Sequence, residues 1–453
     1  MTLSIEHHKE TSKRHLRVVG PLPGPRSLAI REREGRFLAP GSQAIASYAG
    51  VVIQSGTGCE LRDVDGNTFL DLAAGICVAA LGYGHPRYVD ALTRQLSAVH
   101  AGSLTTESRV QALEVVAACL PPGLDRIQFY SGGSEAVESA IRLARAYTGK
   151  SEVLSFWGGF HGKTAGSLAL MGSNFKTGLG PLAPAAYLAP YADCARCPFK
   201  TSYPQCGLLC VEFMRDKLRV ETTGDLAAIL LEPMQGTAGN IIPPPDFLPA
   251  IASVARDKGA VLIADEMITG FGRTGEFFGV NHTQVRPDIM TVGKSLGAGF
   301  PVSGLIARSD IAQTKPWSNP SFSSSSYGGN PLAAAAVAAS VGIIRSDGLV
   351  DNAKRVGAYL KSGFQALSER HPELTAVRGE GLMIGFDLVV PGTLTLWDAA
   401  RCQKLFQALL KRGLLTMAYA PRVRVNPPLI FSIEQAEETL SIFESALGEM
   451  RPA

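Results

Sequence analysis

Short apolar runs alternate with helix-like segments through the middle of the chain, and this alternation restricts the fold more than any other feature of the sequence. The runs lie between residues 105 and 310 and read "RIQFYS", "EVLSFW", "LAAILLEP", "AVLIADEM" and "DIMTVG". Segments typical of helices, such as "SEAVESAIRLARAYTG", separate them. Strands and helices that alternate at this spacing form a mainly parallel sheet with helices on both faces. We therefore predict an α/β fold.

The chain of 453 residues is too long for one small core. Proline and glycine interrupt the first 45 residues, which predicts an extended arm, and "DVDGNTFLDL" predicts a hairpin that turns at Asp65 and Gly66. After an alanine-rich helix at 331–344, helices surround two further strands. We expect an N-terminal arm with part of a small domain over residues 1–80, a large domain over 81–340, and a smaller α+β domain over 341–453.

Composition argues against several classes of protein. Lys and Arg total 43 against 40 Asp and Glu, a net charge of +3, so net charge provides no surface for nucleic acid or membranes. We find neither a signal peptide nor an uninterrupted apolar stretch of about 18 residues. Eight cysteines are too few for a disulfide framework in a chain of this length. We expect a cytoplasmic protein without nucleic-acid or membrane partners.

Three charged residues follow predicted strands of the sheet. Glu232 comes after "AAILL", Asp265 after "VLIA" and Lys294 just after "IMTV". Each carboxylate could instead cap a helix or pair with an arginine. Open parallel sheets, however, bind ligands beyond the carboxyl ends of their strands, and these three residues should meet there.

A glycine-rich turn before a helix adds an anion site to this edge of the sheet. In "YSGGSEAVESAIRLAR" the turn includes Gly133 and Ser134, and amides at the start of a helix favour a phosphate. The turn has neither the dinucleotide fingerprint nor a P-loop lysine. A lysine that can form a Schiff base, a carboxylate for a pyridine nitrogen and a phosphate site are what pyridoxal 5'-phosphate requires.

The sequence resembles class III aminotransferases over nearly its whole length. The likeness rests on "LIADEMITGFGRTGEFFGV" and "PDIMTVGKSLGAGFPVSG", in which Lys294 follows Asp265 by 29 residues. Further motifs occur in the family's order: "PGPRS", "DVDGNTFLDLAAGI", "GYGHP", "SEAVESAIRLAR", "FHGKT", "LEPMQG", "YGGNPLAAAA" and "VRVNPPL". The resemblance implies the fold type I of pyridoxal-phosphate-dependent transferases, with a seven-stranded, mainly parallel sheet and a smaller α+β domain.

The same resemblance implies a set of cofactor contacts. Lys294 would hold the cofactor and move a proton, and Asp265 would pair with the pyridine nitrogen. The other implied contacts are Gly133, Ser134 and the partner subunit's Ser326 at the phosphate, Phe160 beside His161 on one face of the ring, Met267 on the other face, and Ile268 where 4-aminobutyrate enzymes carry a glutamine. The enzyme would then be a homodimer with a shared active site.

Substrate contacts are implied in the same way. Arg424 matches the arginine that grips a substrate carboxylate, and Glu232 would pair with it when an ω-amine donor binds and release it when 2-oxoglutarate arrives. Lys163 stands where 4-aminobutyrate enzymes use arginine for a distal carboxylate, and Ile76 and Cys77 would line the pocket. The implied reaction moves an amino group from an amine or ω-amino acid to a 2-oxo acid such as 2-oxoglutarate or pyruvate.

Two other functions remain open from the sequence. A racemase or epimerase of the same family would use the same lysine and carboxylate, but the presence of Arg424 and Glu232 favours transamination. A non-catalytic regulator would require a DNA-binding module, and the arm of about 45 to 55 residues shows no helix-turn-helix pattern.

Four cysteines cluster in "DCARCPFKTSYPQCGLLCVEF" as C-x2-C-x8-C-x3-C, at Cys194, Cys197, Cys206 and Cys210. The first pair has the spacing of a structural zinc site. Reduced, partly buried cysteines without a metal are the other interpretation. We assign no metal from the sequence.

Overall fold

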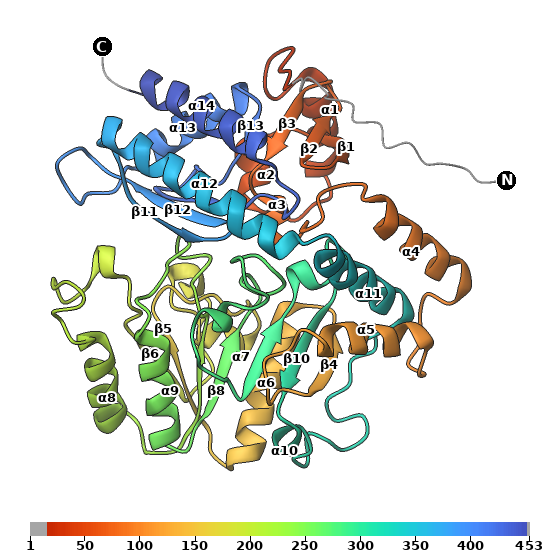
Figure 1. The fold of residues 1–453 in the computed structure, drawn as a ribbon, viewed down its shortest axis with the longest axis vertical. Helices are drawn as coiled ribbons and strands as arrows, with labels where there is room; N and C mark the ends of the chain where they lie inside the picture. Colours follow the sequence, from red (N-terminus) through yellow and green to blue (C-terminus); the bar gives the residue numbers. More distant parts are fainter. Residues whose placement is uncertain (1–15, 451–453) are drawn as a thin grey trace.

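The computed structural model describes residues 16–450, and a seven-stranded sheet forms its centre (Figure 1). The strands are β4 (Arg126–Tyr130), β5 (Glu152–Phe156), β6 (Ala186–Ala189), β7 (Leu226–Leu231), β8 (Val261–Asp265), β9 (Ile289–Val292) and β10 (Ser303–Ala307). Their order is β4-β10-β9-β8-β7-β5-β6, and β10 alone runs antiparallel to its neighbours. The predicted α/β fold with a mainly parallel seven-stranded sheet is confirmed. β6 and β10 are not among the strands that the apolar runs predict.

Helices cover both faces of this sheet because its strands are apolar on both sides. All six residues of β7 are buried; Ala228 and Leu230 pack in a cluster with α6 (Gly133–Thr148), and Ile229 and Leu231 pack in the larger core on the other face. Continuous apolar strands of this kind are typical of buried parallel sheets. The remaining helices around the sheet are α4 (Pro86–Ala98), α5 (Glu107–Ala117), α7 (Ala165–Ala169), α8 (Leu209–Glu221), α9 (Phe247–Asp257), α10 (Ser309–Ala312) and α11 (Pro331–Ser346).

Two smaller sheets lie above the large one in Figure 1. The first contains β1 (Ile53–Thr57), β2 (Glu60–Asp63), β3 (Thr68–Asp71) and β13 (Leu414–Leu415), and the second contains β11 (Leu374–Glu380), β12 (Met383–Leu388) and β14 (Arg422–Val425). The predicted hairpin is present as β2 and β3, and β3 pairs in parallel with β13. The N-terminal hairpin therefore shares a sheet with the C-terminal part of the chain, as the adjacent orange and blue ribbons show.

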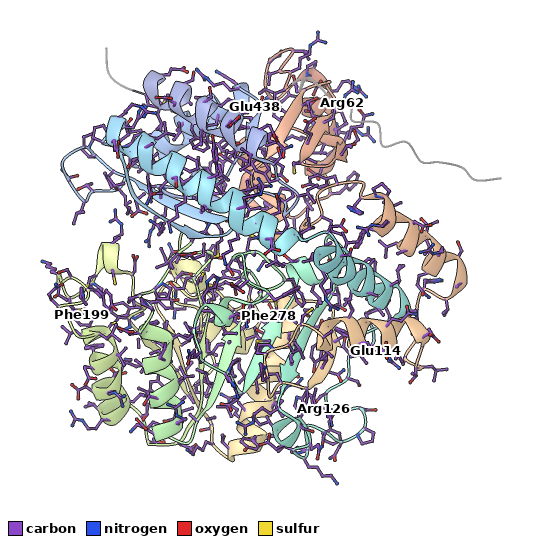
Figure 2. All side chains as sticks on the ribbon, viewed as in Figure 1. Arg62, Glu114, Arg126, Phe199, Phe278 and Glu438 are labelled. Carbon is purple, nitrogen blue, oxygen red and sulfur yellow. The ribbon has the colours of Figure 1, made fainter. Side chains whose placement is uncertain are left out.

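Three long helices pack with these sheets, namely α12 (Leu349–Arg370), α13 (Ala399–Lys411) and α14 (Ile433–Glu449). Short helices α1 (Pro25–Gly35), α2 (Ala44–Ala49) and α3 (Ala74–Cys77) belong to the N-terminal part. Figure 2 shows side chains filling the spaces between the elements, and Phe278, labelled near the centre, is fully buried. The division at residues 80 and 340 remains a prediction.

Within residues 16–450, no single helix is long and apolar enough to cross a membrane. Only α11 and α12 taken together reach that length and composition, and they meet at a bend of 63°. Ten of the side chains of α11 are buried inside the protein, including Val337 and Ile344.

Candidate active site

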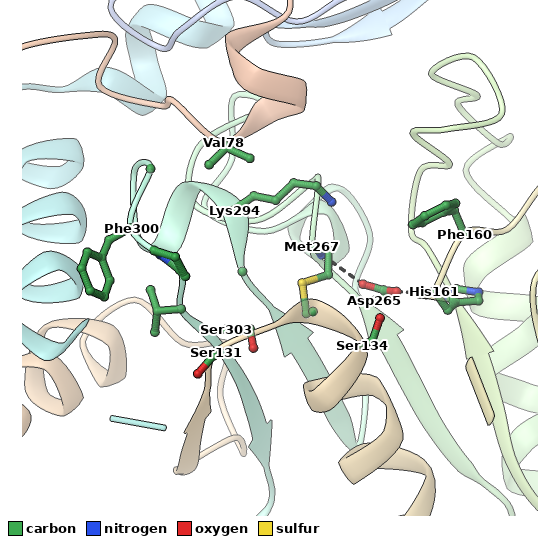
Figure 3. Close-up of a pocket in the computed structure, with 16 residues that line it drawn as sticks. Val78, Ser131, Ser134, Phe160, His161, Asp265, Met267, Lys294, Phe300 and Ser303 are labelled. Atoms are coloured by element: carbon green, nitrogen blue, oxygen red, sulfur yellow. Dashed lines mark hydrogen bonds and ion pairs between the residues drawn. The ribbon is translucent and has the colours of Figure 1, made fainter. Parts of the chain in front are cut away.

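A cavity of about 390 Å³ opens at the carboxyl end of the large sheet (Figure 3). Residues that lie far apart in the sequence line it together. Seven of the predicted site residues are among them: Gly133, Ser134, Phe160, His161, Asp265, Met267 and Lys294. Strands β8 and β9 deliver Asp265 and Lys294 to the same edge, as expected for neighbouring strands of a parallel sheet.

Lys294 projects into this cavity from a tight turn that follows β9 (Figure 3). Its backbone has a φ of +47°, in the left-handed region that non-glycine residues rarely adopt. Gly293 lies beside it, where a Cβ would lie 2.6 Å from Sδ of Met267 and would displace that side chain. Gly297 is needed because a Cβ would lie 2.3 Å from the carbonyl oxygen of Phe300. The glycines around Lys294 thus allow close packing that holds the lysine in place.

Asp265 ends β8 and is 2% exposed. Its Oδ2 lies 2.7 Å from Nδ1 of His161, and its Oδ1 accepts a hydrogen bond from the amide of Met267 at 3.1 Å. Within residues 16–450, no lysine or arginine forms an ion pair with Asp265. The carboxylate is therefore oriented by hydrogen bonds and can face a cation in the cavity.

The start of α6 supplies the anion site of the cavity. Gly133 is the first helical residue, and the first amides of a helix have no partner within the helix. Ser134 is packed closely by the loop that carries Phe160, since a Cβ at Gly162 would lie 2.3 Å from its Oγ. This arrangement fits a phosphate group.

Phe160 and Met267 bring apolar atoms to the cavity, and the ring of Phe160 has Lys163 near it. Phe160 meets Phe175 edge-on, with ring centroids 5.8 Å apart. Nζ of Lys163 lies 5.1 Å from the ring centroid of Phe175 and 6.0 Å from that of Phe160. The ammonium group of Lys163 therefore rests against aromatic rings in this structure and does not line the cavity itself.

Glu232 directly follows β7, and backbone amides bind its carboxylate in this structure. Its carboxylate is 5% exposed and accepts hydrogen bonds from the amides of Phe160, at 2.9 Å, and Gly236, at 2.8 Å. Burial raises the pKa of Glu232, and the negative charge of Asp265 adds to this, although His161 and the two amides oppose it. The backbone thus satisfies this carboxylate, and its pairing with Arg424 when an ω-amine donor binds stays a prediction.

Arg424 and Arg422 lie on β14 but have different partners. Arg424 stands opposite Gly385 of β12, which has no side chain, and its guanidinium has no hydrogen bond or ion pair to another described residue. Arg422 stands opposite Asp387, and its guanidinium binds Asp193 at 2.6 Å. Arg422 is therefore part of an ion-pair network, whereas Arg424 has no such partner among the described residues and does not line the cavity.

Comparison with known proteins agrees with this geometry. The aminotransferase class-III family model matches residues 43–447. The chain belongs to the class III aminotransferase family. The diaminobutyrate–2-oxoglutarate aminotransferase of Rhizobium meliloti is 34% identical, with 88% of each chain covered. The leucine/methionine racemase of Thermococcus litoralis is 31% identical, with 93% of this chain and 95% of the racemase covered.

A solved structure extends the comparison to the cofactor. An amine transaminase from an uncultivated Pseudomonas species, solved with pyridoxal phosphate bound, superimposes with a TM-score of 0.86. It is 28% identical, and the match covers 92% of this chain and 99% of the transaminase. The protein is a pyridoxal-phosphate-dependent aminotransferase, and the lysine, carboxylate and helix start in its cavity fit that cofactor.

Besides Glu232, Lys163 and Arg424, four predicted contacts of the aminotransferase lie outside its cavity lining. Ile268 and Cys77 pack in a buried apolar cluster with Met234 and Met383. The side chain of Ile268 also packs closely against Gly236, which has no side chain to displace it. Ile76 is half-buried and also outside the cavity lining, where Val78 takes the place that we had expected for it. Ser326, the last of the four, is exposed and does not line the cavity of its own chain.

The four clustered cysteines line one small cavity of about 20 Å³. Among residues 16–450, however, no group of three or more His, Cys, Asp or Glu side chains is placed to hold a metal ion. Burial raises the pKa of Cys194 and raises that of Cys210 to about 11.

Sequence reasoning missed two kinds of site residue. Ser303 and Val302 line the cavity from β10 and the loop before it, a strand that the apolar runs had not identified. Ser155, on β5, lies 3.0 Å from Nε2 of His161 and has no local motif. A strand ending in "SF" gives no sign that its serine faces a histidine six residues later.

Proposed function

We propose that this aminotransferase moves an amino group from an amine or ω-amino acid, such as 4-aminobutyrate, to a 2-oxo acid such as 2-oxoglutarate or pyruvate. The observation that carries the proposal is that Lys294, Asp265 and the start of α6 share one cavity. We further propose that the enzyme acts in the cytoplasm. The racemase alternative uses the same three features, so it is separated by experiment.

When bound, pyridoxal phosphate supplies an aldehyde for the amine and a ring that withdraws electrons. The Nζ of Lys294 holds the cofactor between turnovers and moves a proton at the reacting carbon. Asp265 keeps a negative charge at the ring nitrogen, and Gly133 and Ser134 bind the phosphate at the start of α6. Phe160 and Met267 exclude water from the ring faces.

Arg424 is the residue that binds the substrate carboxylate, through two parallel hydrogen bonds. Its support is the unpartnered guanidinium opposite Gly385. Glu232 can turn from its two amides to Arg424 when a donor without a carboxylate at this point binds. Lys163 would attract a distal carboxylate as a point charge, and Ile76 with Cys77 would shape the donor pocket.

A homodimer with a shared site is part of the proposal. Ser326 is exposed, and the flanking Phe322 and Tyr327 are 60% and 69% exposed, respectively. Large exposed apolar side chains around a polar group are typical of an interface. We expect a molar mass near twice 47.9 kDa by light scattering. A mass of 47.9 kDa would contradict the shared site.

The first test follows the cofactor spectrum of the purified enzyme, loaded with one equivalent of pyridoxal phosphate and mixed with 4-aminobutyrate without any oxo acid. Conversion to pyridoxamine phosphate, reversed by 2-oxoglutarate, supports the proposal. Lys294→Ala should abolish the conversion. An unchanged spectrum rejects this donor, and if α-amino acids then lose optical activity while the cofactor stays in its aldehyde form, the enzyme is a racemase.

A further inference from the structure

We propose that Ser155 is a positioning residue that holds His161 in one tautomer, and that His161 in turn orients Asp265. The inference rests on the role proposed above for Asp265. Oγ of Ser155 lies 3.0 Å from Nε2 of His161, and Nδ1 of the same ring lies 2.7 Å from Oδ2 of Asp265. The three residues are 0%, 3% and 2% exposed, so water does not compete for these bonds.

The local backbone brings the three side chains together. Ser155 is the one hydroxyl residue of β5, whose five residues are all buried, and its neighbours Leu154 and Phe156 pack in the main core. The chain then reverses, with the amide of Gly159 donating to the carbonyl of Phe156 at 3.0 Å. A Cβ at Gly159 would lie 2.9 Å from the carbonyl oxygen of Phe156 and 3.0 Å from Nε2 of His161, so glycine allows the imidazole to return over the end of its own strand.

The hydrogen-bonding capacity of each group determines the tautomer. An ionised Asp265 can only accept, so Nδ1 of His161 carries the proton that lies between them. If Nε2 accepts from Ser155, every group in the chain is satisfied. If Nε2 were also protonated, the hydroxyl proton of Ser155 would be buried without an acceptor, because Ser155 has no other hydrogen bond to a described side chain.

A neutral His161 matters for the cavity. An imidazolium 2.7 Å from Asp265 would neutralise the carboxylate that should face a cationic ring nitrogen. A neutral imidazole with its N–H on Nδ1 orients the carboxylate and leaves its charge in place. On metal-bound histidines, a hydrogen-bond partner at the second ring nitrogen likewise fixes the tautomer and the orientation of the ring.

A serine, a histidine and an aspartate in a hydrogen-bonded row also occur in hydrolases, where the serine is a nucleophile. That role does not apply to Ser155, because it is fully buried and does not line the cavity. Here the aspartate faces the cavity and the serine lies at the buried end of the row.

The decisive measurement is the nitrogen NMR spectrum of the protein labelled with ¹⁵N-histidine, without cofactor. The chain has eight histidines, and His161→Asn identifies the signals of His161. We expect Nδ1 protonated and Nε2 of the acceptor type in the wild-type protein. A protonated Nε2 there would overturn the proposal, whatever the variants do.

Ser155→Ala removes only the hydroxyl group and should convert His161 to a mixture of tautomers. With cofactor bound, we expect kcat to fall roughly tenfold with little change in KM. Ser155→Thr keeps a hydroxyl in a strand position that suits a β-branched residue, and it should restore the wild-type signals. Unchanged His161 signals in Ser155→Ala would refute the proposal.

Ser27→Ala is the matched control. Ser27 is also fully buried, and its hydroxyl also serves a carboxylate, that of Asp65 at 2.6 Å, but it lies in the N-terminal part of the chain. It should leave the signals of His161 unchanged. If the enzyme fails to transaminate, the function proposed above is wrong, whereas the tautomer in the cofactor-free protein tests Ser155 independently.

Discussion

Buried carboxylates at the carboxyl end of the large sheet have partners different from those of Asp387, a buried carboxylate in the three-stranded sheet. At the sheet rim, by which we mean Glu232, Asp265 and Glu266, backbone amides, a hydroxyl and a histidine serve the carboxylates. At the arginine junction, which consists of Arg196, Arg378, Asp387 and Arg422, one carboxylate meets three guanidinium groups. Both groups of carboxylates are 5% exposed or less.

The pKa shifts run in opposite directions in the two regions. Burial raises the pKa of Glu232 and raises that of Glu266 to about 7. Burial acts in the same sense on Asp387, but the charge of Arg378, the hydrogen bond from Arg196 and the charge of Arg422 outweigh it and lower the pKa. The guanidinium groups of the junction compensate the negative charge of Asp387, and the junction connects the loop at 193–196 to β12 and β14. The rim leaves negative charge without a fixed cation, which suits a site that receives cations as ligands.

Asp265→Asn should produce the largest effect, and it acts on the reaction rate. It removes the charge at the rim but keeps one acceptor oxygen, so we expect cofactor to bind while kcat falls about 10³-fold. The measurement is kcat beside the cofactor content of the same sample. Asp265→Glu, which keeps the charge, should recover part of the rate. Full activity in Asp265→Asn would show that the rim charge has no role in the chemistry.

Asp387→Ala should act on stability instead. It leaves three arginines without their shared carboxylate, and loss of one partner from a buried network costs about 3 to 5 kcal/mol. The free energy of unfolding from urea titration measures this. Asp310→Ala is the control, because its ion pair with Arg308 is exposed and is worth at most about 1 kcal/mol. Equal losses in the two variants would mean that the junction is no stronger than a surface pair.

The sequence allowed prediction of the rim but not of the junction. Asp265 ends β8 and Lys294 follows β9, the next strand, so a local pattern and one rule about parallel sheets locate them. The ligands of Asp387 come from residues 196, 378 and 422, and no local pattern shows that these meet. The same limit applies to Ser155 and to the cysteine loop, where spacing gives the residues but only packing decides whether the thiols converge.

Glu266 offers a pH test of the rim. Its pKa of about 7 lies above the ordinary value of 4.5, so between these values the folded state holds more protons than the unfolded state. This contribution to the free energy of unfolding is therefore fully present below pH 4.5 and is lost as the pH rises through 7, by an amount on the order of 3 kcal/mol.

The measurement is urea unfolding of the wild-type protein and of Glu266→Gln at pH 5, 6, 7 and 8. Glutamine lowers stability at every pH because its NH₂ group faces an amide N–H. The loss of stability with rising pH, however, should be smaller in Glu266→Gln than in the wild-type protein. Glu232 contributes in the same direction in both proteins, so the difference between them isolates Glu266. An identical pH profile would contradict a raised pKa for Glu266.

The smallest expected effect separates two arginines on the same strand. Arg424→Lys keeps the charge but loses the paired donors, so KM for the oxo acid should rise about tenfold with kcat little changed. Arg422→Lys perturbs the junction at Asp387 and Asp193, so it should lower stability and leave KM within about twofold of the wild-type value. The difference follows from the residues opposite them, Gly385 and Asp387. Equal increases in KM in the two variants would show that the junction and the substrate site are one unit. Arg422, which already pairs with Asp193 and Asp387, would then also hold the substrate.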